Sequence, residues 1–159
     1  MKPPKISNVR IAVVEKDDAT RSLLEHVLMY CVNSAIQTFS DSDEAWKKIE
    51  SGEIFDIVIS SVESGQMNGL ELLIKIKEAR PETVCIITSS LPNHESSAKT
   101  LGADAFLGKP FSIHHLFDLI RAFVAGSENK KKKKCPLTSA PYTITPENLW
   151  AKQTPYAIF

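Results

Sequence analysis

Residues 9–125 alternate short apolar runs with longer amphipathic stretches, and this alternation constrains the fold more than any other feature of the chain. Short β-branched runs are typical of strands buried on both faces, and the stretches between them are typical of helices that cover a parallel sheet. The strands that these runs predict are Arg10–Val14, Ala35–Phe39, Asp56–Ser60, Val84–Thr88 and Ala105–Leu107. The pattern therefore predicts one α/β domain.

Capping and turn residues separate these strands from five predicted helices. We expect Ser42 to cap the second helix, Pro81 to end the third and Ser112 to cap the fifth. Gly102 should stop the fourth helix in the left-handed conformation. Five βα units of this size predict a flavodoxin-like doubly wound five-stranded parallel sheet, in the order 2-1-3-4-5, with any site at the carboxyl ends of the strands.

The composition changes after residue 125. The stretch from residue 128 to the end holds six lysines, five of them at 130–134, and two glutamates, which leaves 13 basic and 17 acidic residues before it. We therefore expect an N-terminal arm at 1–8, a domain at 9–125 and a Lys-rich linker and tail at 126–159. Three separated cysteines and the lack of a long apolar run favour a soluble cytoplasmic protein without a membrane span.

Four separated motifs narrow the function. Phe55–Ser61 and Gln66–Leu73 resemble the third-strand region of response-regulator receiver domains, and Gly102–Phe111 resembles their fifth-strand signature. Val13–Glu15 and Ile87–Ser89 lie where that family has the ends of its first and fourth strands. Because the motifs follow one another in the right order, the chain is identified as a member of that receiver family.

The resemblance implies a phosphoryl-transfer site. In the family, an aspartate at the tip of strand three is the nucleophile, an acidic pair after strand one binds Mg²⁺, and a hydroxyl residue and a lysine contact the phosphoryl oxygens. Carried over position by position, the nucleophile falls on Ser61, the acidic pair on Glu15 and Lys16, the hydroxyl on Thr88 and the lysine on Lys109.

Two of these five positions are wrong for the chemistry. The Ser61 hydroxyl stays protonated at neutral pH and cannot form an acyl phosphate. Lys16 places a cation where the family has its main metal-binding carboxylate, and a like charge at about 4 Å costs roughly 4 kcal/mol per unit charge at an effective dielectric near 20. We interpret the chain as a degenerate receiver, or pseudo-receiver, that is not an enzyme and has no catalytic residue, metal site or cofactor, with Mg²⁺ binding lost.

The charged residues around this position have two further interpretations. We hypothesise a salt-bridge cluster that fills the pocket, in which the lysines Lys16 and Lys109 pair with Glu15, Asp17 or Glu63. Asp17 or Asp18 is interpreted as the cap of the first helix rather than as a shifted metal-binding pair.

Thr88 and Phe106 resemble the family's pair that couples phosphorylation to a change of surface. Because the trigger is missing here, we expect Phe106 to have a fixed packing role. His94, His114 and His115 are interpreted as surface residues rather than as a metal site.

The leading functional hypothesis is a phosphorylation-independent signalling and interaction module that binds protein partners. Homodimerisation through helix 4, strand 5 and helix 5 follows from the resemblance. Two alternatives stay open: a residually phosphorylatable regulator that uses Asp17 or Glu63, and a regulator that associates with nucleic acid or an anionic surface through its Lys-rich tail. The aromatic end of the chain, 149–159, is a candidate docking peptide. The partner, the pathway and an output domain on another chain stay open.

Overall fold

The computed structural model describes residues 6–7, 9–33 and 35–131. In chain order, its elements are β1 (Ile6–Ser7), β2 (Ile11–Val14), α1 (Asp18–Cys31), β3 (Val32–Asn33), β4 (Ile36–Phe39), α2 (Ser42–Glu50), β5 (Ile57–Ser61), α3 (Gly69–Ala79), β6 (Val84–Ser89), α4 (Asn93–Thr100), β7 (Ala105–Gly108) and α5 (Ile113–Lys131).

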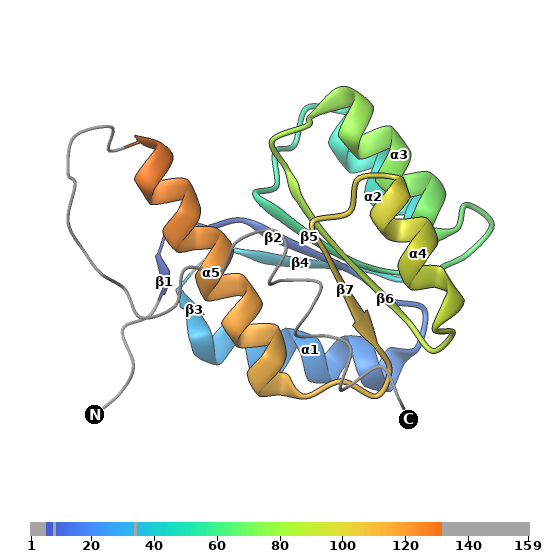
Figure 1. The fold of residues 1–159 in the computed structure, drawn as a ribbon, viewed down its shortest axis with the longest axis horizontal. Helices are drawn as coiled ribbons and strands as arrows, with labels where there is room; N and C mark the ends of the chain where they lie inside the picture. Colours follow the sequence, from blue (N-terminus) through green and yellow to red (C-terminus); the bar gives the residue numbers. More distant parts are fainter. Residues whose placement is uncertain (1–5, 8, 34, 132–159) are drawn as a thin grey trace.

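Five of the strands form one parallel sheet in the order β4-β2-β5-β6-β7 (Figure 1). This arrangement confirms the predicted order 2-1-3-4-5. The register pairs Val14 with Phe39 and Ser61 with Thr88, so the carboxyl ends of the strands reach one edge of the sheet. Side chains that follow these ends are therefore brought together from distant parts of the sequence.

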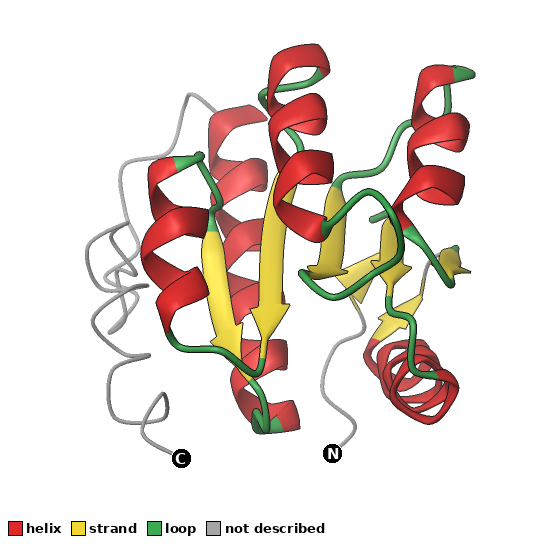
Figure 2. Ribbon diagram, turned by 90° about the vertical axis from the view of Figure 1, so that its right-hand side faces the viewer, coloured by secondary structure: helices red, strands yellow, loops and turns green. Residues whose placement is uncertain are grey.

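Helices cover both faces of the sheet (Figures 1 and 2). Leu28 of α1 and Leu116 of α5 pack with Ile59 on one face. On the other face, Ala45 of α2 and Leu72 of α3 belong to a second buried cluster, which also takes in Ala98 of α4. Burial on both faces explains why β2 and the first three residues of β5 are continuously apolar rather than alternating.

The cap of α2 differs from the prediction. Asp41 is the capping residue, because its carboxylate accepts a hydrogen bond of 2.7 Å from the backbone N–H of Glu44. Ser42 is the first helical residue and is fully buried, and its hydroxyl lies 2.6 Å from that of Ser64. The prediction of a Ser42 cap is therefore wrong. Two cap-competent residues stand side by side, and the carboxylate takes the exposed role while the small hydroxyl takes the buried one.

Several boundaries match the predictions closely. α3 ends at Ala79, ahead of Pro81, and α5 begins directly after Ser112. Gly102 has a φ of +94°, as expected for a left-handed stop after α4. α4 begins at Asn93 and buries only Ala98.

The ends of the domain carry two unpredicted features. Ile6 and Ser7, in the predicted arm, pair with Val32 and Asn33 as a two-stranded parallel sheet that is too short to leave a sequence pattern. α5 continues past residue 125 to Lys131, so the helix runs beyond the point where the composition changes. The predictions for the tail, including its aromatic end at 149–159, lie outside the described residues.

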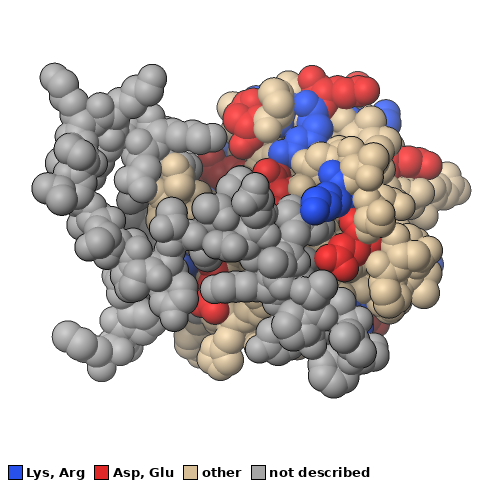
Figure 3. Space-filling model, viewed as in Figure 1, with Lys and Arg blue, Asp and Glu red and all other residues tan. Residues whose placement is uncertain are grey.

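Basic and acidic side chains are interspersed over the visible part of the surface that the structure describes (Figure 3). Within residues 6–7, 9–33 and 35–131, no helix combines the length and the apolar character needed to cross a membrane.

Candidate functional site

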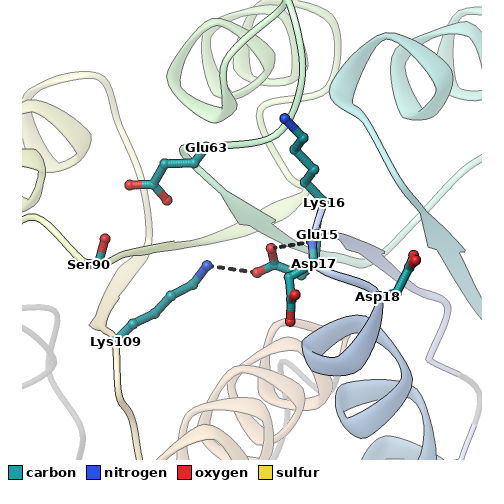
Figure 4. A pocket seen from close by; sticks show the side chains of 7 residues that line it. All are labelled: Glu15, Lys16, Asp17, Asp18, Glu63, Ser90 and Lys109. Carbon is teal, nitrogen blue, oxygen red and sulfur yellow. Dashed lines mark hydrogen bonds and ion pairs between the residues drawn. The ribbon is translucent and has the colours of Figure 1, made fainter.

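A polar pocket lies at the carboxyl edge of the sheet. Ser61 and Ser89 are the last residues of β5 and β6, Glu15 follows β2 and Lys109 follows β7. Figure 4 shows Glu15 and Lys109 directed toward each other across this pocket. Its lining residues are Glu15, Lys16, Asp17, Asp18, Glu63, Ser90 and Lys109. The fold thus brings the predicted positions Glu15, Ser61 and Lys109 together.

Lys109 is the centre of this pocket. Its ammonium group donates a hydrogen bond of 2.8 Å to Glu15 Oε2 and another of 2.9 Å to Ser61 Oγ. The Glu15 side chain is only 5% exposed, and its second oxygen accepts a hydrogen bond from the backbone N–H of Asp17. The lysine expected to contact phosphoryl oxygens is therefore bound to groups of the protein itself.

Glu63 extends this network to β6. Its Oε2 accepts a hydrogen bond of 3.1 Å from the Ser61 hydroxyl, and its Oε1 accepts one of 2.8 Å from the Ser89 hydroxyl. An unbroken series of hydrogen bonds thus runs from Glu15 through Lys109, Ser61 and Glu63 to Ser89.

Ser89 links the same series to the start of α4. Its oxygen accepts a hydrogen bond of 3.1 Å from the Leu91 N–H and lies 2.8 Å from His94 Nδ1. Because a hydroxyl has one proton, and Ser89 donates it to Glu63, the contact with His94 requires an Nδ1–H that donates to Ser89. His94 was expected at the surface, but its side chain is only 22% exposed.

The surroundings of Glu63 favour its ionised form. Partial burial acts to raise the pKa of this carboxyl group, but hydrogen bonds from Ser89, from its own backbone and from Ser61, together with the charge of Lys109, hold the pKa below its usual value. The pocket therefore contains a permanent carboxylate at neutral pH.

The hypothesised salt-bridge cluster forms only in part. Lys109 pairs with Glu15 as proposed, but the exposed Lys16 side chain points away from both groups (Figure 4). Asp17 accepts hydrogen bonds from the backbone N–H and the hydroxyl of Thr20, which confirms its role as the cap of α1. Both bonds lower the pKa of Asp17, and the bond from the Thr20 hydroxyl has the larger effect.

Acidic residues at this edge do not converge on a single point. The Asp18 carboxylate pairs with Arg21 at the start of α1, while Glu15 is paired with Lys109. Within the described part of the chain, no group of three or more His, Cys, Asp and Glu side chains is arranged to hold a metal ion.

Thr88 and Phe106 are buried, with 2% and 1% of their surfaces exposed. Phe106 belongs to the core cluster that includes Ile87 and Leu72. Among the described residues, the hydroxyl from β6 that donates to Glu63 belongs to Ser89, the residue after Thr88. The sequence presents adjacent hydroxyl residues here, and strand periodicity alone does not decide which one reaches the pocket.

The backbone at Ser61 is held by the start of α3. A Cβ atom on Gly69 would lie 2.3 Å from the Ser61 carbonyl oxygen, so only glycine permits this approach. The Gly69 N–H also donates to the carbonyl of Val62. Asn68 caps α3 through the N–H groups of Leu70 and Glu71. The sequence Asn68-Gly69 thus fixes the position of the strand tip that presents Ser61.

Sequence reasoning did not identify Ser89 and His94 as pocket-linked residues. The family resemblance assigns a role to neither of them, and a serine at the end of a strand or a histidine in the first turn of a helix carries no spacing signal. Glu63 entered as one of several partners for the lysines and as an alternative phosphoacceptor. The available signal was its place two residues after the strand tip, where a long side chain can turn back toward the pocket.

Comparisons with known proteins identify the family of this chain. Residues 11–121 match the family model described as the response regulator receiver domain. The transcriptional regulatory protein FlgR of Helicobacter pylori is 30% identical over 112 residues, which is 70% of this chain and 29% of that protein. The response regulator ArlR of Staphylococcus aureus is 29% identical over 76% of this chain and 55% of its own length.

The DNA-binding transcriptional regulator NtrC of Azospirillum brasilense is 27% identical over 72% of this chain and 24% of its own length. The chain thus spans only part of the length of these relatives.

Solved structures show the same fold. The BeF3-activated receiver domain of DrrB matches with a TM-score of 0.66 and 26% identity over 74% of this chain and 97% of that one. A CheY-like receiver domain protein from Methanospirillum hungatei matches with a TM-score of 0.71 and 24% identity over 77% and 98% of the two chains, and supports the fold alone. On the family match, which takes in more than half of its residues, the chain belongs to the response regulator receiver domain family.

Proposed function

We propose that this chain is a pseudo-receiver, a phosphorylation-independent interaction module built on the two-component receiver scaffold. The observation that carries the proposal is Ser61. Its hydroxyl stands where the family resemblance places the nucleophilic aspartate, and it is held between Lys109 at 2.9 Å and Glu63 at 3.1 Å. A serine hydroxyl cannot form the labile acyl phosphate of the family.

The donor set at the pocket does not fit Mg²⁺. The ion prefers several oxygen ligands with near-octahedral geometry, and it is usually bound by one or two carboxylates. Here Glu15 is engaged by Lys109, Lys16 replaces the second acidic residue, and Ser61 offers only a neutral hydroxyl. We therefore propose that the chain works without a metal or another cofactor, and is not an enzyme.

The alternative phosphoacceptors have other roles. Asp17 holds the first turn of α1 through Thr20, and a phosphoryl group on it would break that cap. Glu63 accepts hydrogen bonds at both oxygens, from Ser61 and Ser89. The alternative that relies on the Lys-rich tail concerns residues outside the described part of the chain.

The proposed function requires a surface for protein partners. The resemblance suggests homodimerisation through α4, β7 and α5. Exposed apolar side chains suggest a second surface on α1, where Leu23, Met29 and Tyr30 are 53%, 59% and 81% exposed. Leu91, which is 49% exposed, lies two residues before α4. We propose that binding at these surfaces does not depend on a phosphoryl signal.

Beryllofluoride provides a test, because with Mg²⁺ it mimics a phosphoryl group on an aspartate. Amide spectra of the full chain would be recorded before and after both reagents are added. We expect no shifts at Ser61, Ser89 or Lys109, since the carboxylate that would hold the beryllium is missing. Saturable shifts at these residues would refute the proposal. The variant with Ser61→Asp and Lys16→Asp serves as the control that shows the response of a restored site.

A further inference from the structure

The receiver pocket already contains an anion. Glu63 places its carboxylate between the hydroxyl of Ser61 and that of Ser89, within the field of the Lys109 ammonium group. A phosphoryl group on the family's aspartate would need the same partners, namely a lysine and a hydroxyl from the neighbouring strand. The side chain is 45% exposed, so it reaches this position from the mouth of the pocket rather than from the core.

The hydroxyl that receives this carboxylate also controls the loop after β6. Ser89 is fully buried, and its oxygen accepts hydrogen bonds from the Leu91 N–H at 3.1 Å and from the ring of His94 at 2.8 Å. With one donated and two accepted bonds, the hydroxyl is saturated. Its orientation is therefore set by the acceptor, which is Glu63. Removing that acceptor frees the proton of Ser89 and loosens both other contacts.

The start of α4 depends on these contacts with Ser89. Its N-cap is Pro92, which makes no side-chain hydrogen bond to the first turn, whereas α1, α2 and α3 are capped by the side chains of Asp17, Asp41 and Asn68. Its eight residues bury only Ala98. A helix with little buried area and no side-chain cap opens easily unless another contact holds its first turn.

We propose that Glu63 is a built-in substitute for the phosphoryl group, which holds the β6–α4 loop and the start of α4 in one conformation through Ser89 and His94. The chain then presents a single, permanently selected α4 surface, with the exposed Leu91 at its edge. This inference rests on the proposed function, because in a site that can be phosphorylated the Glu63 carboxylate would compete with the phosphoryl group rather than replace it. It adds to that function the means by which the surface is kept constant.

Hydrogen exchange of backbone amides in the full chain tests the inference. Glu63→Gln keeps the size of the side chain and removes its charge. We expect amides at 90–95 to exchange about three- to tenfold faster, since Gln offers one neutral acceptor oxygen in place of the two carboxylate oxygens that accept from Ser61 and Ser89. Amides of β2 and β5 should keep their protection, which separates loss of local positioning from general destabilisation. Glu82→Gln, the same change at an exposed loop position, should leave exchange at 90–95 unaltered.

Ser89→Ala provides a second variant for the same measurement. It removes the hydroxyl that links Glu63 to Leu91 and His94, so it should increase exchange at 90–95 at least as much as Glu63→Gln does. If Ser89→Ala fails to fold, Glu63→Gln still decides the question. Exchange at 90–95 that matches Glu82→Gln would overturn the inference and leave the proposed function standing. Beryllofluoride shifts in the unmodified chain would instead overturn the proposed function.

Discussion

The ion pair between Lys109 and Glu15 should make a measurable contribution to stability. Replacing Glu15 by Gln keeps the side-chain size and an acceptor for the Asp17 N–H, and removes the charge that faces Lys109. Two unit charges at 2.8 Å attract by roughly 6 kcal/mol at an effective dielectric near 20. The cost of removing both groups from water offsets most of this attraction.

The net change in the free energy of unfolding depends on the burial of Glu15 and on the hydrogen bond that Lys109 keeps. Hydrogen bonds to charged groups contribute about 1.5–3 kcal/mol, and Glu15 is only 5% exposed. Lys109 is 24% exposed and keeps its bond to Ser61, so part of the loss is recovered. We expect Glu15→Gln to lower the free energy of unfolding by about 2 kcal/mol. For a chain of this size, this corresponds to a fall of roughly 4–8 °C in Tm.

Urea-induced unfolding near neutral pH measures this loss, provided that the m value stays constant. The matched control is Asp118→Asn, which removes a carboxylate from the exposed pair with Arg121, whose closest atoms are 4.0 Å apart. This surface pair should contribute less than about 0.5 kcal/mol. Adding Lys109→Met to Glu15→Gln should recover part of the loss, since no charge is then left unpaired. A loss for Glu15→Gln no larger than that of the control would refute the reasoning.

Three further predictions concern Asp17, Cys85 and Gly69. The lowered pKa of Asp17 means that its stabilisation is complete above its unfolded pKa and is lost as the pH falls through the folded one. Asp17→Asn keeps a cap but should flatten the fall in unfolding free energy below about pH 4, and an unchanged acid profile would contradict this. Burial raises the pKa of the Cys85 thiol to about 12, so peptide mapping should find it alkylated by iodoacetamide only after unfolding; alkylation of the native state would contradict this. Gly69→Ala should cost about 2 kcal/mol or more in urea unfolding because of the contact with the Ser61 carbonyl, while Gly126→Ala, which meets no atom within 4 Å, should cost nothing; equal effects would contradict the packing argument.

The apolar runs predicted a parallel sheet, because burial on both faces demands such runs, as in Ile11–Val14 and residues 57–59, and the count of five βα units predicted the order of its strands. The parallel strands bring their carboxyl ends to one edge, and the structure there joins Glu15, Ser61 and Lys109, three positions to which the family resemblance points, by hydrogen bonds.

Individual hydrogen bonds were less predictable. Asp41 and Ser42 are both good caps, and only the packing of Ser42 against Ser64 decides between them. Thr88 and Ser89 are both hydroxyl residues, and the bond to Glu63 depends on which side chain faces it. Such choices depend on rotamers and on neighbours far apart in the chain, and no local spacing encodes them.

Treatment of the full, unmodified chain with acetyl phosphate and Mg²⁺, followed by intact-mass measurement, tests the central claim most directly. Ser61 offers no carboxylate for an acyl phosphate, and Lys16 opposes the metal. We predict no gain of a phosphoryl group in the unmodified chain or in Ser61→Asp, which still carries Lys16. The variant with both Ser61→Asp and Lys16→Asp provides the positive control. A hydroxylamine-sensitive phosphoryl group on the unmodified chain would contradict the claim.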